Sequence, residues 1–355
     1  MVSPTSSASP VKVLVVDDSA FMRFTITKHL NDYPGITVLG SAKDGREALE
    51  MIPQLKPDVV TLDVEMPNLD GLSTLREIMS RHPLPVVMLS SLTSEGTLET
   101  VRALTLGAVD FVAKPDNKAN MASILEEVGN KVMRAANARV WKTPQRSPII
   151  ETVSPARISD KKVRALRKQD KIVVIGSSTG GPRALNTVVP MLTADIPAAF
   201  MIIQHMPAGF TRSLSERLNT TSELFVKEAA PDDRLEVGKI LLAPGGFHTV
   251  FDENEKVTLN QNPTVHGVRP AVDVTLLSLA KIYGNRVVTA ILTGMGSDGT
   301  NAAMLVHNSG GWVISEAEET CVVYGMPRSV FEAGASNEVV PLEKVADAIR
   351  AAVGR

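Results

Sequence analysis

Short apolar runs recur along this chain of 355 residues, and an amphipathic stretch follows almost every one of them. The first part of the chain contains such runs at Val11–Val16, Val38–Ser41, Val59–Leu62, Val86–Leu89 and Ala108–Val112. The pattern resumes after Lys171, with runs at Ile172–Ile175, Ala199–Gln204, Lys239–Ala243 and Val287–Leu292. Apolar runs that alternate with helical stretches are typical of parallel β-sheets covered by helices. The sequence therefore predicts the α/β class, with two doubly wound parallel-sheet domains.

A change of composition separates the two sets of runs. Residues 142–170 contain three prolines and carry eight Lys or Arg against three Asp or Glu. Such segments commonly join domains, although the basic charge could also serve as a docking segment. We expect a disordered tail over residues 1–10, a first domain over 11–135, an interdomain linker over 136–170 and a second domain over 171–355.

Overall composition excludes several classes of function. The formal net charge of −2 creates no basic field for nucleic acid, and no apolar run approaches the ~20 residues of a membrane-spanning helix. The single cysteine, Cys321, cannot form an internal disulfide, and the first residues do not resemble a signal peptide. We therefore expect a cytoplasmic protein with neither nucleic acid nor direct membrane insertion among its interactions.

Carboxylates follow the first and third apolar runs. Asp17 and Asp18 come after the first run and Asp63 after the third, and ligands of parallel sheets bind at these strand ends. Converging carboxylates need a cation, and oxygen ligands suit Mg²⁺. Ser90 and Lys114, which come after the fourth and fifth runs, complete a site suited to phosphoryl transfer. An acidic pair that only caps a helix is the alternative, but the polar residues at the other strand ends argue against it.

A serine lies at the start of a glycine-rich turn in the second domain. Ser178 follows an apolar strand in the sequence Ile-Val-Val-Ile-Gly-Ser-Ser-Thr-Gly-Gly. A sharp turn from strand to helix exposes such a side chain and leaves backbone N–H groups free to hold an oxyanion. The same turn could hold a phosphate, so the motif alone leaves catalysis and phosphate binding open.

A nucleophilic serine needs a base, and the base needs a carboxylate that fixes its tautomer. His205 and Asp298 follow two other strands of the second domain and have the required chemistry. His248 and His266 compete for the role of base, and Asp273 competes for the role of acid. Asp273 also begins a predicted helix over Asp273–Ile282 and could be its N-terminal cap. The order serine, histidine, aspartate disfavours a standard α/β-hydrolase.

The first domain resembles a response-regulator receiver domain over residues 11–135. The resemblance rests on Val-Asp-Asp-Ser at 16–19, Leu-Asp-Val-Glu-Met-Pro at 62–67, Asp70-Gly71 and Phe-Val-Ala-Lys-Pro at 111–115. It implies a flavodoxin-like fold, phosphorylation of Asp63, and a Mg²⁺ site made by Asp17, Asp18, Asp63 and the Glu65 backbone carbonyl. It also implies a switch made by Ser90, Phe111 and Lys114.

The second domain resembles the catalytic domain of chemotaxis protein-glutamate methylesterases, the CheB family. The matching motifs are Gly-Ser-Ser-Thr-Gly-Gly at 176–181, Gln-His-Met-Pro-Ala-Gly-Phe-Thr at 204–211, Ala-Pro-Gly-Gly at 243–246, Arg-Pro-Ala-Val-Asp at 269–273 and Leu-Thr-Gly-Met-Gly-Ser-Asp-Gly at 292–299. The resemblance implies a Rossmann-like domain with a catalytic triad of Ser178, His205 and Asp298. Backbone N–H groups of Thr179 and Met295 would form the oxyanion hole.

Together the two resemblances imply a phosphorylation-activated esterase. Its substrates would be glutamate γ-methyl esters and particular glutamines of methyl-accepting chemotaxis receptors, and its phosphodonor a chemotaxis histidine kinase. The receiver would need Mg²⁺, and the esterase reaction would need no cofactor. Two alternatives remain: a phosphorylation-switched binding protein without catalysis, and an esterase for another acyl substrate. A dinucleotide-binding turn is disfavoured, because Gly-x-Gly-x-x-Gly does not follow Ile175.

Overall fold

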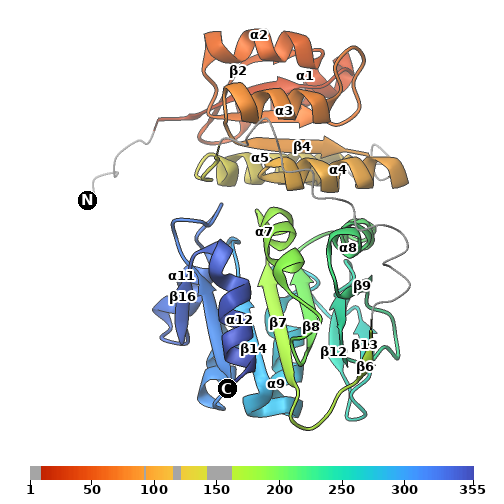
Figure 1. Cartoon of the computed structure of the whole chain (residues 1–355). Coiled ribbons are helices and arrows are strands. Elements are labelled where there is room, and N and C mark those ends of the chain that lie inside the picture. The colour runs from red at the N-terminus through yellow and green to blue at the C-terminus, as the bar shows by residue number, and fades with distance from the viewer. Residues whose placement is uncertain (1–8, 92, 115–120, 142–161) are drawn as a thin grey trace, which may run out of the picture. The chain divides into compact units, whose positions relative to one another are not determined.

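The chain forms two compact units, which comprise residues 1–145 and 146–355. The computed structural model describes residues 9–91, 93–114, 121–141 and 162–355 (Figure 1). Residues 1–8 of the expected tail, Pro115 of the receiver motif and residues 142–161 of the expected linker lie outside the described residues. The predicted domain boundaries therefore stay a prediction.

The first unit is a parallel five-stranded sheet with strand order β2-β1-β3-β4-β5. Its strands are β1 (Val11–Val16), β2 (Ile36–Ala42), β3 (Val59–Asp63), β4 (Val86–Ser90) and β5 (Asp110–Ala113). Its helices are α1 (Ala20–Asp32), α2 (Gly45–Leu55), α3 (Gly71–Arg81), α4 (Ser94–Leu106) and α5 (Met121–Ala135). This is the flavodoxin-like strand order, in which the direction of winding reverses between β1 and β3.

The second unit is built on a parallel seven-stranded sheet of order β16-β15-β14-β7-β8-β11-β9. These strands are β7 (Lys171–Ser177), β8 (Ala198–Gln204), β9 (Phe225–Glu228), β11 (Lys239–Leu242), β14 (Val287–Ile291), β15 (Trp312–Glu316) and β16 (Glu338–Val340). Its helices are α7 (Gly181–Val188), α8 (Phe210–Thr221), α9 (Val272–Tyr283), α10 (Thr300–Asn308), α11 (Met326–Glu332) and α12 (Val345–Val353). The winding reverses between β7 and β14, the position at which ligands of such sheets bind.

Two short pairings complete the second unit. Strands β12 (His248–Phe251) and β13 (Val257–Asn260) form an antiparallel hairpin. Strand β6 (Arg164–Ala165), inside the expected linker, pairs with β10 (Glu236–Val237). Asp170 accepts two hydrogen bonds from the Arg164 guanidinium at 2.6 and 2.9 Å. The chain therefore joins the second unit several residues before Lys171.

The central strands of both sheets are continuous apolar runs because helices shield their side chains from water on both faces. On one face of the second sheet, Ile172 and Val174 of β7 belong to a buried cluster with Leu276 and Leu279 of α9 and Val306 of α10. Figure 1 shows helices packed against the sheet of each unit. The predicted α/β class with two parallel sheets is confirmed. None of the described helices combines the length and apolar character needed to cross a membrane.

Replacing Gly71 with alanine should destabilise the first unit. A Cβ at this position would lie 2.0 Å from the Asp63 carbonyl oxygen and 2.9 Å from the Val64 Cα, and backbone atoms cannot rotate away. We expect a loss of about 2 kcal/mol in the free energy of unfolding, as for other overpacked sites. Calorimetry of the full chain measures it, with Gly354→Ala as control, because a Cβ there meets nothing closer than 3.7 Å. Equal stability of the two variants would contradict the prediction.

Candidate functional site

Three carboxylates meet at the reversal point of the first sheet. Asp17 follows β1, Asp63 ends the neighbouring strand β3, and Asp18 comes next to Asp17. One ligand oxygen from each lies within 4.8 Å of the others. Lys114, which follows β5, places its Nζ 2.6 Å from Asp63 Oδ2 and 3.0 Å from Asp17 Oδ2. The predicted convergence of these four side chains is thus present in the structure.

Burial and mutual repulsion disfavour the ionised form of the carboxylates in this cluster. Burial raises the pKa of Asp63 to about 6 and the charge of Asp17 adds to the rise, although the Lys114 ammonium opposes it. Burial alone would lower the pKa of Lys114, but the charges of Asp63 and Asp17 outweigh it and raise that pKa. A site with this excess of negative charge and only oxygen donors fits a hard divalent cation such as Mg²⁺.

The other predicted switch residues lie on the next two strands of the sheet, Ser90 at the end of β4 and Phe111 in β5. Ser90 is fully buried, and its Oγ lies 3.1 Å from the Gly96 carbonyl oxygen and 2.5 Å from Thr100 Oγ1. Its hydroxyl is therefore engaged with α4, and the structure gives no Ser90–Asp63 hydrogen bond among the described residues. The Phe111 ring is buried, with Lys131 Nζ 5.1 Å from its centroid. Glu65 donates its backbone N–H to Asp63 Oδ1 at 3.4 Å, which places its peptide next to the carboxylates.

Ser178 occupies the turn between β7 and α7, as the sequence predicts. Its N–H donates to the Thr293 carbonyl, which follows β14, at 3.0 Å, and its own carbonyl accepts the Gly181 N–H at 2.8 Å. Gly180 has a φ of +80°, a conformation that glycine adopts without strain. The turn is therefore fixed on one side by the loop after β14 and on the other by the first residue of α7.

His205 and Asp298 form a direct pair. His205 Nε2 lies 2.7 Å from Asp298 Oδ2, and both side chains are more than nine-tenths buried. The backbone N–H of His205 donates to the Ser177 carbonyl at 3.1 Å, so the histidine lies alongside the serine turn. The pair therefore joins the ends of β8 and β14 on either side of β7.

The structure gives no hydrogen bond between the Ser178 hydroxyl and His205 among the described residues. Because a carboxylate only accepts, the nitrogen facing Asp298 carries the proton, and His205 Nδ1 is left as the acceptor for a serine proton. Catalytic hydrogen bonds are often long in enzymes without substrate. The predicted acid and base are therefore in contact. The serine turn lies next to them, because the His205 N–H binds the carbonyl of Ser177, the residue before Ser178.

Asp298 also caps a helix, a role that the sequence suggested for Asp273. Its two carboxylate oxygens accept the N–H groups of Val272 and Asp273 at 2.6 and 2.9 Å. Helix α9 starts after Ala271, and Asp273 lies inside its first turn, so the suggestion that Asp273 caps it is wrong. Burial acts to raise the pKa of Asp298, but the hydrogen bond and charge of His205 and these two N–H donors outweigh it and lower that pKa.

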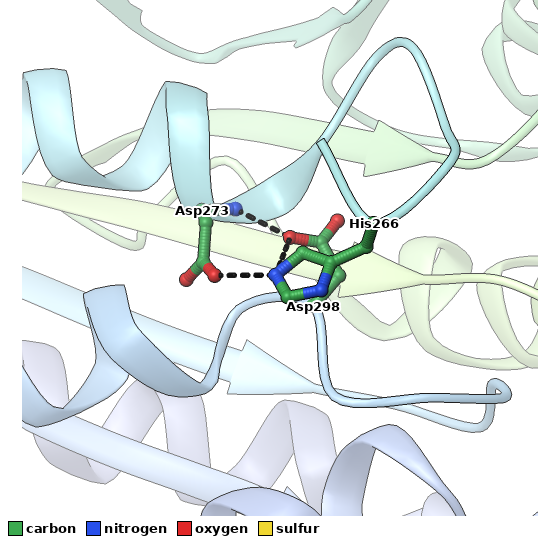
Figure 2. Close-up of side chains that lie close together, drawn as sticks. All are labelled: His266, Asp273 and Asp298. Atoms are coloured by element: carbon green, nitrogen blue, oxygen red, sulfur yellow. Dashed lines mark hydrogen bonds and ion pairs between the residues drawn. The ribbon is translucent and has the colours of Figure 1, made fainter. Parts of the chain in front are cut away.

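The competing residues pair with one another or with the backbone. Figure 2 shows His266 between the carboxylates of Asp273 and Asp298, with its Nε2 at 3.0 and 3.9 Å from their oxygens. Asp273 additionally accepts the Ala302 N–H at 2.8 Å. The ligand atoms of these three side chains lie within 4.8 Å of one another, close enough to bind one metal ion. Hydrogen bonds, however, already occupy His266 Nε2 and the carboxylate oxygens of Asp298. His248 is buried and its Nε2 lies 3.1 Å from the Pro263 carbonyl, which fits a structural role.

The two residues predicted to supply oxyanion donors flank Ser178. Thr179 follows it directly, and its carbonyl accepts the Thr293 hydroxyl at 3.0 Å. Met295 lies in the loop after β14, and its side chain is exposed. A Cβ on the preceding Gly294 would lie 2.7 Å from Ser178 Cβ, so this loop passes directly over the serine. Helix α7 begins just after this turn, and the positive end of its dipole lies at this N-terminus, where it favours a developing negative charge.

Gln204 is a site residue that the sequence reasoning did not select. Its Nε2 donates to the carbonyls of Ser178 and His205 at 2.9 and 3.1 Å, and its Oε1 accepts the Ser177 hydroxyl at 2.7 Å. The amide therefore ties the serine turn to the histidine. The sequence feature that could have identified Gln204 is its position at the end of β8, directly before His205.

Family models match most of both units. Residues 173–349 match the CheB methylesterase model, and residues 13–126 match the response regulator receiver domain model. A protein-glutamate methylesterase/protein-glutamine glutaminase from Symbiobacterium thermophilum is 51% identical, over 97% of this chain and 98% of its own length. The protein of the same description from Thermotoga maritima is 45% identical, over 94% of this chain and 96% of its own length.

A solved structure supports the same relationship for the second unit. The crystal structure of the Thermotoga maritima CheB methylesterase catalytic domain matches with a TM-score of 0.50 and 48% sequence identity. The match covers 51% of this chain and 98% of that domain.

Replacing Gln204 with leucine should destabilise the second unit. The change leaves the buried Ser177 hydroxyl without its acceptor and the His205 carbonyl without the amide donor, and buried polar groups without partners cost about 1–3 kcal/mol each. We expect the free energy of unfolding to fall by about 2–4 kcal/mol, measured by denaturant titration of the full chain. The control is Gln261→Leu, because Gln261 is exposed. A loss no larger than that of the control would show that the amide bridge is dispensable.

Proposed function

The chain belongs to the CheB methylesterase family and carries a response regulator receiver domain, and we propose that Ser178, His205 and Asp298 carry out its reaction. It is a phosphorylation-activated protein-glutamate methylesterase and protein-glutamine glutaminase. Its receiver accepts phosphate from a histidine kinase, and its catalytic domain acts on chemoreceptors. Hydrolysis is therefore favoured over a binding module without catalysis.

The first half of the reaction forms an acyl-enzyme. Ser178 Oγ attacks the γ-carbonyl carbon of a receptor glutamate methyl ester, and His205 Nδ1 takes the serine proton. Asp298 stabilises the protonated imidazole through the 2.7 Å contact with His205 Nε2. When the tetrahedral intermediate breaks down, the ester C–O bond breaks and His205 gives the proton to methoxide, so that methanol leaves.

The second half restores the enzyme. Water attacks the Ser178 ester while His205 takes one of its protons, and the proton then passes to Ser178 Oγ as the receptor glutamate leaves as a carboxylic acid. With a glutamine substrate the same steps release ammonia in place of methanol. The N–H groups of Thr179 and Met295 hold the oxyanion in each tetrahedral intermediate, and one such donor is typically worth about 3 kcal/mol.

The phosphorylation site is the carboxylate cluster of the first unit. We propose Asp63 as the phosphoryl acceptor, with Ser90, Phe111 and Lys114 as the residues that respond to it. Receiver phosphorylation depends on Mg²⁺, which neutralises the phosphoryl oxygens when bound. Asp17, Asp18, Asp63 and the Glu65 carbonyl would hold the ion. Lys114, already paired with Asp63 at 2.6 Å, would bind a phosphoryl oxygen.

The remaining features follow from this assignment. The ester hydrolysis needs no cofactor, because the serine, histidine and backbone donors supply nucleophile, base and oxyanion site. The protein works in the cytoplasm, where the modified receptor helices are accessible, and its phosphodonor is the chemotaxis histidine kinase. The observation that carries the catalytic assignment is the buried contact between His205 and Asp298 at the strand ends that flank Ser178.

Methanol release from a methylated receptor signalling fragment tests the assignment. A small phosphodonor with Mg²⁺ should raise the rate of the unmodified protein, whereas Ser178→Ala should abolish release with and without the phosphodonor. Asp63→Asn should retain the basal rate and lose the stimulation, because the amide cannot accept the phosphoryl group. Release that survives Ser178→Ala would remove the nucleophile, and stimulation that survives Asp63→Asn would move the phosphorylation site.

The two neighbouring aspartates should differ sharply in their effect on the rate. Asp298→Asn removes the anion that fixes the His205 tautomer, and we expect kcat to fall about 10³- to 10⁴-fold. Asp273→Asn keeps an acceptor for the Ala302 N–H, and we expect a fall of less than about tenfold. Both are measured by methanol release, with thermal unfolding as the check on folding. Equal losses, or the larger loss for Asp273→Asn, would contradict the choice of acid.

A further inference from the structure

A carboxyl group that the reaction scheme does not use lies buried beside the serine turn. Glu316 is the last residue of β15 and has no exposed surface. Its Oε2 accepts the Thr293 N–H at 2.7 Å, and its Oε1 accepts the Thr320 hydroxyl at 3.0 Å. Burying an ionisable group is costly unless hydrogen bonds compensate, so the partners of Glu316 indicate what the carboxyl group does here.

Thr293 connects Glu316 to the nucleophile. Its carbonyl accepts the Ser178 N–H at 3.0 Å, and its hydroxyl donates to the Thr179 carbonyl at the same distance. The hydroxyl also accepts the Val323 N–H at 3.0 Å. One residue therefore holds the backbone of both Ser178 and Thr179, and Glu316 holds the peptide N–H of that residue.

The loop that contains Met295 starts from the same anchor. Gly294 follows Thr293 and lies against Ser178, where a Cβ would be 2.7 Å from the Ser178 Cβ and 3.0 Å from its nitrogen. Gly294 is itself fixed by its N–H, which donates to the Val323 carbonyl at 3.0 Å. A change in the orientation of the Thr293 peptide would therefore shift both residues proposed to hold the oxyanion.

The surroundings of Glu316 shift its ionisation towards neutral pH. Burial raises the pKa of Glu316 to about 7, although hydrogen bonds from Thr293, Thr320 and Cys321 act against burial. Two charged groups from other elements also act on it: Arg183 of α7 and Glu343 of the short 3₁₀ helix η4 (Leu342–Lys344). The ionised carboxylate is the stronger acceptor for the Thr293 N–H.

We propose that Glu316 is a positioning residue for the hydrolysis, which holds Thr293 and thereby sets the oxyanion donors of Thr179 and Met295 around Ser178. The inference rests on the proposed function. Ionisation of Glu316 strengthens the anchor, so the rate rises as this group loses its proton. The residue touches neither substrate nor the reacting atoms, and it acts through the backbone of Thr293.

The test compares Glu316→Leu and Glu316→Gln in the full chain, with phosphodonor and Mg²⁺ present and methanol release as the readout. Leucine leaves the Thr293 N–H without an acceptor, and we expect kcat to fall 10- to 100-fold with KM within twofold of the unmodified protein. Glutamine keeps an acceptor that cannot ionise, and we expect kcat within about threefold at pH 7. Glu319→Leu is the matched control at an exposed site, and it should keep the full rate.

The pH dependence of kcat separates positioning from a merely structural role. Ionisation makes Glu316 the stronger acceptor, so the ratio of the kcat of the unmodified protein to that of Glu316→Gln should rise, by up to about threefold, as the pH increases through the pKa of Glu316. A merely structural role would leave this ratio constant. A Leu variant that folds and keeps the full kcat, or a ratio that does not change with pH, would overturn the proposal. If Ser178→Ala retained activity in the same assay, the proposed function itself would have failed.

Discussion

The parallel pairing of β7 with β8 on one side and β14 on the other is the constraint that brings the proposed catalytic residues together. Parallel strands end at the same edge, so Ser178, His205 and the loop from Thr293 to Asp298 meet although they are far apart in the sequence. The reversal of winding between β7 and β14 leaves room for these side chains. The first unit uses the same constraint, since β1 and β3 bring Asp17 and Asp63 together.

Each carboxylate at these strand ends has an environment that suits a different task. Asp298 receives two helix N–H groups and His205, so it stays ionised despite burial and can stabilise an imidazolium. Burial raises the pKa of Asp63, the charge of Asp17 adds to the rise and Lys114 opposes it, and a cation or a phosphoryl group changes that balance. Glu316 accepts hydrogen bonds from Thr293 and Thr320 but has no partner like the histidine beside Asp298, and burial raises its pKa to about 7. Burial acts on all three groups, and the charge of their partners decides the outcome.

The sequence predicted the elements more completely than the contacts between them. Apolar strands and their polar ends follow local rules, which is why the strands of the first sheet agree with the predicted runs to within two residues at each end. The suggestion that Asp273 caps α9 was wrong, because a helix cap can come from a residue distant in the sequence, and Asp298 supplies it here. Gln204 and Glu316 also end strands, but their roles depend on which carbonyl or N–H lies opposite, and only the sheet order determines that.

Identification of the covalent intermediate tests the central claim most directly. In a rapid-quench reaction of the phosphorylated protein with a methylated receptor fragment, an acyl-enzyme that accumulates gives a burst of methanol, and tandem mass spectrometry of the enzyme's peptides locates the ester. The structure predicts an ester between the receptor glutamate and Ser178, and none on Ser177, whose hydroxyl is buried against Gln204. An ester on Ser177, or a methanol burst without any covalent species, would contradict the account.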